Sequence, residues 1–204
     1  MISGINENSG IHVEGHLKIY CPETEKVYVN KRNAIHFENM SYALAQSLAN
    51  VGQGYIQEMS LGNGGTSIDP TGIITYLTPN VSGTNASLYN QTYSKVVNPR
   101  SSNNSDPTRN KTEIRHVTGT TYTDILISCL LDYGEPNGQA AYDNVSDMEQ
   151  DFVFDELGLR SYSPTGAGRL ITHVIFHPVQ KSLNRLIQID YTIRVQSLSG
   201  FNEV

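Results

Sequence analysis

Two pairs of histidines are the first residues whose spacing could support chemistry. His173 and His177 are four residues apart, and so are His12 and His16. On a helix this spacing could place two imidazoles on one metal ion. On a strand, at roughly 3.3 Å per residue, the two side chains are about 13 Å apart and cannot share an ion. We therefore predict no metal site here, and expect these histidines to hydrogen-bond at a sheet surface or contact a neighbouring subunit.

Two further motifs could suggest a catalytic or ligand-binding site. Residues 62–66 (Gly-Asn-Gly-Gly-Thr) resemble part of a phosphate loop. They lack its Gly-Lys-Ser/Thr ending, so we interpret them as a tight turn whose glycines need positive φ. Asp155 and Glu156 are adjacent carboxylates, but neighbouring strand residues face opposite ways and cannot form an acid/base pair. One of them could point inward as a hydrogen-bond acceptor. The sequence predicts no catalytic residue and no cofactor.

The region that would position such residues is a pair of strand-like runs near the C-terminus. From Leu186 to Gln196, β-branched or aromatic residues alternate with polar ones, and the apolar phase comprises Ile187, Ile189, Tyr191, Ile193 and Val195. This period of two is typical of a half-buried strand. The run before Pro178 is apolar on both faces, which predicts a strand covered on two sides. We expect Pro178 to end that strand, and the two strands to pair as an antiparallel hairpin at the centre of a β-sandwich.

One helix is predicted, at residues 39–50. Apolar residues recur there at intervals of three and four, with Asn39 as the N-cap and Gly52 as the left-handed residue after the end. Further strands are predicted at residues 12–20, 27–29, 55–61, 73–77, 121–132 and 152–159, the last broken by Gly158. Together these patterns predict a mainly β fold: an antiparallel β-sandwich with one short amphipathic helix.

The middle of the chain, residues 78–120, is rich in Asn, Ser, Thr and Pro. It has little to bury, so we expect a long polar loop that becomes ordered at a contact with a neighbouring subunit. Residues 94–97 and 113–117 are candidates for strand pairing across that contact. We predict a flexible N-terminus at residues 1–10 and a single β-rich domain at residues 11–204.

Composition excludes several classes of protein. The net charge is −6 and the basic residues are scattered, so the chain lacks the basic patch of a nucleic-acid binder. No apolar run approaches the roughly 18 residues of a membrane span, and the polar first fifteen residues give no sign of a signal peptide. The two cysteines are Cys21 and Cys129. Cys129 lies in an apolar strand pattern and is expected to be a small buried hydrophobe rather than half of a disulfide.

Three segments occur in an order that resembles small virion proteins of tailed bacteriophages, including collar- and tail-fibre-associated β-sandwich modules. They are residues 61–66 (Leu-Gly-Asn-Gly-Gly-Thr), 154–159 (Phe-Asp-Glu-Leu-Gly-Leu) and 170–181 (Leu-Ile-Thr-His-Val-Ile-Phe-His-Pro-Val-Gln-Lys). The resemblance spans residues 33–195. It implies a non-enzymatic building block of a phage particle, assembled in the host cytoplasm, with itself and other virion proteins as partners.

The position in the particle stays open among neck or collar, tail, baseplate and capsid surface. A capsid decoration protein is one alternative function. A carbohydrate-binding adhesion module, with a host surface glycan as its partner, is another, because Tyr is frequent and exposed Tyr and Asn-rich loops could bind a sugar. The residues expected at an assembly interface are Ser94, Val96, Arg100, Asp106, Arg109, Arg115 and His177.

Overall fold

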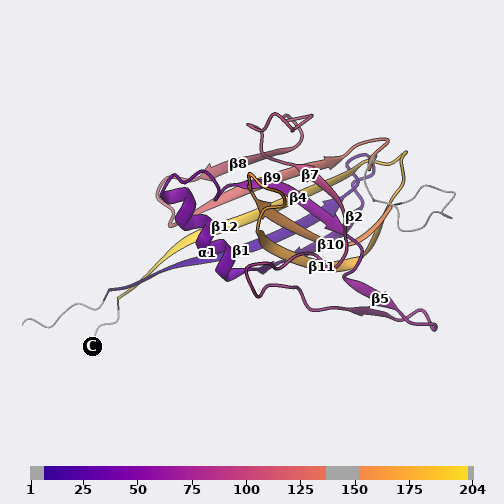
Figure 1. Ribbon diagram of the computed structural model, residues 1–204, viewed down its shortest axis with the longest axis horizontal. Helices are drawn as coiled ribbons and strands as arrows, with labels where there is room; N and C mark the ends of the chain where they lie inside the picture. Colours follow the sequence, from indigo (N-terminus) through magenta and orange to yellow (C-terminus); the bar gives the residue numbers. More distant parts are fainter. Residues whose placement is uncertain (1–6, 137–151, 202–204) are drawn as a thin grey trace, which may run out of the picture.

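The chain folds into two antiparallel β-sheets packed face to face, with one helix at their side (Figure 1). The structure is a computed structural model and describes residues 7–136 and 152–201. The fold is mainly β and antiparallel, and its two main sheets are consistent with a β-sandwich, as the sequence predicts.

Each main sheet has five strands. Sheet A has the order β2 (Val27–Arg32), β1 (Glu7–Tyr20), β12 (Ile187–Phe201), β9 (Tyr122–Leu131) and β8 (Lys111–His116). Sheet B has the order β3 (Ala34–Ile35), β11 (Leu170–Lys181), β10 (Phe152–Ser161), β4 (Ile56–Gly62) and β7 (Gln91–Val96). A separate two-stranded sheet pairs β5 (Thr66–Ile68) with β6 (Ile74–Tyr76).

The core lies between the two sheets and confirms the phase predicted for β12. Ile187, Ile189, Tyr191 and Ile193 are buried, and Val195 packs against the core. Aromatic rings from sheet B face them; Phe152 and Phe154 stack with ring centres 5.4 Å apart. The predicted two-sided burial of residues 170–176 is also confirmed, because all seven are buried.

The predicted hairpin between β11 and β12 is wrong. β11 pairs with β10 and β3 in sheet B, whereas β12 pairs with β1 and β9 in sheet A. The connection between them therefore crosses from one sheet to the other. Pro178 does not end β11 either, because the strand continues to Lys181. Pro178 falls where the register between β10 and β11 shifts, so no ladder hydrogen bond is required of it.

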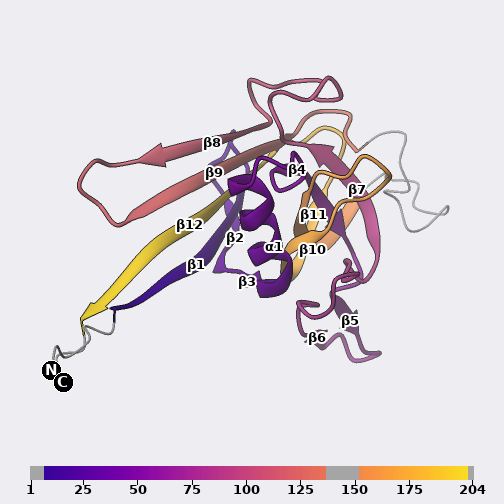
Figure 2. The same cartoon turned by 60° about the vertical axis from the view of Figure 1, so that its left-hand side comes forward.

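The predicted loop at residues 78–120 contains two short strands, which overlap residues 94–97 and 113–117, the segments predicted to pair with a neighbouring subunit. β7 pairs with β4 and β8 pairs with β9, so both find partners within the chain. At the start, residues 7–10 belong to β1 rather than to a flexible terminus. β1 and β12 run side by side from Tyr20 with Gln188 to Glu7 with Phe201, and form an arm that extends beyond the rest of the sandwich (Figure 2).

The helix α1 (Phe37–Leu48) begins two residues earlier than predicted. Its N-cap is His36, whose Nδ1 accepts a hydrogen bond from the Asn39 backbone. At the other end Asn50, with a φ of 54°, is the left-handed residue directly after the C-cap Ala49. Gly52, predicted for this role, also has a positive φ, of 80°, but lies two residues further on. Met40 and Ala43 join the core, while Leu48 is 85% exposed. The first turns of α1 thus pack on β11, and its last turn does not.

Candidate assembly surface

Six of the seven predicted interface residues lie on one side of the molecule. Ser94 and Val96 are on β7, the last strand of sheet B, and Arg115 is on β8, the last strand of sheet A. Residues 97–110 connect these two strands and carry the other three. The hydroxyl of Thr112 donates a hydrogen bond to the Val97 carbonyl at 3.1 Å, which holds the two sheet edges together. We call β7, β8 and residues 97–110 the β7–β8 side.

The seventh predicted residue lies elsewhere. His177 is on β11, and its Nδ1 is 3.1 Å from the hydroxyl of Tyr76 on β6. His173, four residues earlier, is buried and has different partners. The two histidines therefore act separately, as their spacing on a strand predicts. Among residues 7–136 and 152–201 no three His, Cys, Asp or Glu side chains gather in a way that could hold a metal ion.

The connecting segment is ordered by its own side chains. Asn104 donates to the carbonyls of Asn98 at 3.1 Å and Asn110 at 2.7 Å, which closes the loop on itself. Asp106 accepts from the Thr108 hydroxyl at 2.6 Å. Asn110 is almost fully buried, and its Oδ1 accepts from the Leu130 backbone at 2.9 Å, which fastens the loop to β9. The chain itself therefore supplies hydrogen-bond partners for residues 98–110, and the contact with a neighbouring subunit stays a prediction.

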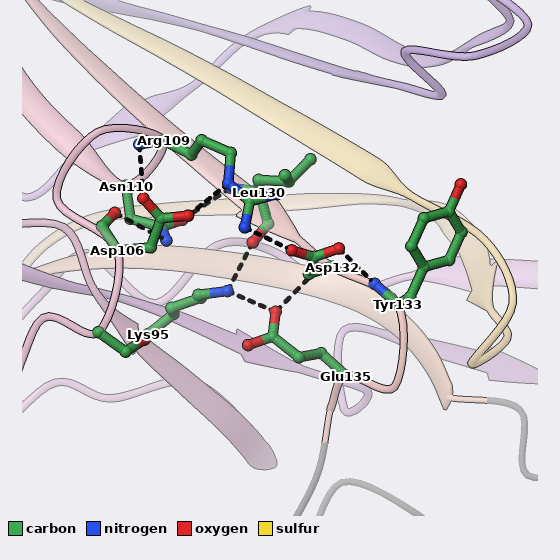
Figure 3. Close-up of a pocket in the computed structure, with 9 residues that line it drawn as sticks. Lys95, Asp106, Arg109, Asn110, Leu130, Asp132, Tyr133 and Glu135 are labelled. Atoms are coloured by element: carbon green, nitrogen blue, oxygen red, sulfur yellow. Dashed lines mark hydrogen bonds and ion pairs between the residues drawn. The ribbon is translucent and has the colours of Figure 1, made fainter.

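A cavity of about 340 Å³ lies beneath this loop (Figure 3). Arg109 pairs with Asp106, and with Asp132 at 2.6 Å. Lys95 pairs with Glu135 and also donates to the Leu130 carbonyl at 2.6 Å. The cavity is lined by Lys95, Ser105, Asp106, Arg109, Asn110, Leu130, Asp132, Tyr133 and Glu135.

The charged side chains around this cavity pair with one another: the cations Lys95 and Arg109 face the carboxylates of Asp106, Asp132 and Glu135. Hydrogen bonds from Thr108 and Arg109 hold the pKa of Asp106 well below its usual range. The pKa of Asp132 is also lowered, first by the Tyr133 backbone N–H and then by Arg109. Both carboxylates are therefore ionised near neutral pH, and both pair with Arg109. Each charged side chain here already has a partner within the chain, so the network fastens the loop to β9.

Lys181 also stabilises the turn after β9, and the sequence analysis did not predict this role. It is fully buried, and its Nζ donates to the carbonyls of Asp132 at 3.0 Å, Glu135 at 2.8 Å and Ser182 at 2.9 Å. Burial lowers its pKa to about 8, against the influence of Glu135 and Asp132. The signal was present in the sequence, because Lys181 follows Val179 in the inward phase of β11.

The adjacent carboxylates on β10 are both buried, whereas the strand pattern predicted at most one inward. The register with β11 shifts between Phe154 and Glu156, so Asp155 occupies a bulge. Asp155 accepts from the backbones of Gly65 and Thr66, each at 2.8 Å. Burial raises the pKa of Asp155 despite these hydrogen bonds. A bulge thus lets two neighbouring carboxylates serve the same loop.

Glu156 holds the other half of that loop and the segment before β7. Its Oε1 accepts from the backbones of Gly64 at 3.1 Å and Asn90 at 2.8 Å, and its Oε2 from Tyr89 at 2.9 Å. Oε2 is also 2.9 Å from His173 Nε2. Burial alone would raise the pKa of Glu156, but hydrogen bonds from His173, Asn90, Tyr89 and Gly64 outweigh it, and the pKa is lowered.

The hydrogen bonds of His173 fix which of its ring nitrogens carries the hydrogen. Its Nδ1 lies 2.7 Å from the backbone N–H of Asn80 and must accept from it. Nε2 therefore carries the hydrogen and donates it to Glu156. The imidazole and the carboxylate both lie completely within the protein. This pair fastens the segment before β7 to the outer face of sheet B.

The glycines of residues 62–66 are required by close contacts rather than by positive φ, so that part of the prediction is wrong. A Cβ on Gly64 would lie 2.7 Å from the Asn90 nitrogen. On Gly62 it would lie 2.3 Å from the Asn90 carbonyl oxygen. None of these glycines is among the positive-φ residues of the described chain. The loop packs closely against its neighbours, and its backbone N–H groups donate to the two β10 carboxylates.

Cys21 and Cys129 are both free and buried, and burial raises the pKa of Cys129 to about 12. No helix in the described part of the chain is long and apolar enough to cross a membrane.

Comparisons of the chain with protein-family models, with curated proteins and with solved structures found no match.

Proposed function

We propose that this chain is a bacteriophage virion structural protein, a non-enzymatic building block present in many copies at the neck, collar or tail. The sequence resemblance described above supports the proposal. The observation that carries it is the β7–β8 side, where the edge strands of both sheets, as the described residues order them, lie together. An open sheet edge can accept another strand through its backbone groups, which is a common way for protein subunits to join.

The hydrogen bonds of the buried carboxylates and histidine support the same proposal. The carboxylates of Asp155 and Glu156 are occupied by backbone donors of their own chain. The buried histidine, His173, is held between Asn80 and Glu156. These groups stabilise loops, which suits a protein whose task is to keep a fixed shape.

The test is to find the protein in assembled particles. Virions released from a host that carries the gene would be purified, probed with an antibody against this chain, and quantified by mass spectrometry. We expect a fixed, multi-copy amount for each particle, with the antibody label at the neck or tail. A protein that stays in the soluble lysate and is absent from intact particles would contradict the proposal. Labels spread over the head would instead support the alternative of a capsid decoration protein.

A carbohydrate-binding role is the second candidate, and an aromatic cluster favours it. Tyr55 and Tyr162 stack with ring centres 5.2 Å apart, and Tyr55 is 40% exposed. Nearby on the helix side, the Arg169 guanidinium lies 4.2 Å from the ring centre of Tyr42. Exposed aromatic faces are suited to sugar rings. A glycan array would test this role: binding that Tyr55→Ala abolishes would favour it, and no binding would remove it.

A further inference from the structure

β8 is an edge strand whose exposed side chains continue two rows that run across sheet A. It pairs with β9 on one side, and the described chain places no strand on its other side (Figure 2). Ile114, near the middle of β8, is 76% exposed. Such an edge is open to pairing with another strand.

The first row lies on the outer face of sheet A and alternates in charge. Glu14 lies opposite Arg194, Arg194 opposite Asp124, and Asp124 opposite Arg115. Arg194 and Asp124 form two parallel hydrogen bonds of 2.8 and 3.0 Å. The row ends at Arg115 on the edge strand, so an added strand would continue the alternation with a carboxylate at that position.

The second row lies on the core-facing side of the sheet. Ile193 is opposite Ile125, and Ile125 is opposite Ile114. Exposure increases along this row, from 1% at Ile193 through the half-buried Ile125 to 76% at Ile114. An apolar residue on an added strand, opposite Ile114, would cover the exposed end of the row.

A second copy of β8 supplies both groups, and geometry limits how it can pair. When two copies of one strand pair antiparallel about a two-fold axis, the contacts are reciprocal. If one residue of the first copy faces a second residue of the other copy, the second residue of the first copy also faces the first residue of the other. Residues that face each other must have side chains on the same side of the sheet, so their numbers differ by an even number. One residue of β8 therefore lies on the axis.

Two registers pair nearly the whole length of β8 with its copy. They differ in which charged side chains face each other. An axis at Glu113 places this carboxylate opposite itself and Lys111 opposite Arg115, which juxtaposes like charges. An axis at Ile114 places Glu113 opposite Arg115 twice, and Ile114 against Ile114. The second register supplies the missing carboxylate of the outer row and covers the exposed isoleucine of the inner row.

We infer that two copies of this chain join their A sheets by pairing β8 with β8 antiparallel, with Ile114 on the two-fold axis. The inference rests on the proposed function only in taking the partner to be a second copy of a self-assembling protein. It gives that protein one defined contact: two Glu113–Arg115 pairs on the outer face, and an unbroken isoleucine row across both copies on the inner face.

Charge reversal tests the register directly. Glu113→Arg alone and Arg115→Glu alone each replace two attractive pairs by two repulsive ones. We expect each to raise the dissociation constant of the dimer about tenfold or more, measured by analytical ultracentrifugation. An equimolar mixture of the two variants should restore dimerisation, because a strand with two cations then meets one with two carboxylates. Arg32→Glu, on β2 at the opposite edge of sheet A, is the matched control and should leave the dimer unchanged.

A cysteine on the axis gives a second test that does not depend on charge. Side chains directly opposite each other have Cβ atoms about 4.5–5.5 Å apart, close to the distance that a disulfide spans. Ile114→Cys should therefore form a disulfide-linked dimer on oxidation, read on a non-reducing gel. Ile68→Cys, at a 64% exposed position on β5, should not, and the native Cys21 and Cys129 are buried and do not compete.

The outcomes separate the contact from the function. If the wild-type protein is found in particles, but the charge reversals change nothing and Ile114→Cys does not cross-link, the inference is overturned and the proposed function stands. If the wild-type protein stays monomeric at its highest soluble concentration, the inference also fails. If both tests show the β8–β8 dimer but the protein is absent from every particle, the contact is supported and the proposed function in a phage particle fails.

Discussion

Glu156 and His173 form a completely buried pair in which Nε2 donates to Oε2 at 2.9 Å. Replacing Glu156 by Gln leaves an amide oxygen for one pair of donors and an NH₂ group facing the other pair. If the NH₂ group faces His173, the ring can accept from it only by moving its own hydrogen to Nδ1, where it would meet the Asn80 N–H. We expect Glu156→Gln to lower the free energy of unfolding by about 1–3 kcal/mol for each donor left unsatisfied. Urea denaturation measures the loss, and Glu25→Gln, at an exposed glutamate in the turn between β1 and β2, is the control and should cost less than about 0.5 kcal/mol.

The same glutamate predicts a dependence on pH. The pKa of Glu156 is lowered from 4.5 in the folded protein, where four hydrogen bonds outweigh the burial that would raise it. The unfolded chain therefore takes up a proton at this site at a higher pH than the folded chain does. The stabilisation is complete above about pH 4.5 and is lost as the pH falls through the folded pKa.

The measurement is the difference in unfolding free energy between wild type and Glu156→Gln, because Asp155 shifts the opposite way and affects both proteins. We expect the difference to be constant from pH 7 to 5 and to shrink below about pH 4.5. A difference unchanged down to pH 3 would show that folding does not lower the pKa of this carboxylate.

Ile189 tests the position of the core. It is fully buried at the centre of β12, so Ile189→Ala should cost about 2–5 kcal/mol. Ile189→Asp should cost more, because it also buries a charge. Ile114→Ala makes the same change in an exposed strand residue and should cost less than about 1 kcal/mol in dilute solution. Similar losses for the two alanine variants in chemical denaturation would contradict this assignment of the core.

Lys181 tests whether a buried ammonium fixes the turn after β9. Lys181→Met keeps most of the aliphatic stem but leaves three backbone carbonyls, of Asp132, Glu135 and Ser182, without their donor. We expect a loss of about 1–3 kcal/mol for each carbonyl that water does not reach. Lys26→Met, at an exposed lysine, is the control. Equal melting temperatures for the two variants would mean that solvent replaces the ammonium at no cost.

The sequence predicts local structure in this chain better than it predicts strand partners. The alternation around Ile189 sets the phase of β12 correctly, because burial on one face acts on every second residue. The partner of β12 was wrong, because the residues between β11 and β12 can close a hairpin or cross between sheets, and the choice depends on β1, far away in sequence. Residues 94–97 and 113–117 were predicted to pair with a neighbouring subunit, but β7 and β8 pair with β4 and β9 of their own chain, which their polar composition does not reveal.

The burial of both Asp155 and Glu156 could not be predicted from the sequence. A strand pattern turns only one of Asp155 and Glu156 inward, and the bulge that buries both is visible only in the register with β11. Six of the predicted interface residues do lie on one side of the molecule, because the polar segment that suggested them connects two edge strands. His177 does not belong with them, since its place on β11 is set by sheet B.

The position of β12 determines when sheet A can fold during synthesis. This strand comes last in the described chain, yet it lies in the middle of sheet A, between β1 and β9. During synthesis, the β1–β2 and β8–β9 pairs emerge from the ribosome as separate hairpins with no strand between them. Two-stranded hairpins are at best marginally stable alone, so sheet A can close only after translation has reached β12. Ribosome-bound chains that stop before Ile187 should therefore remain sensitive to protease along β1 and β9.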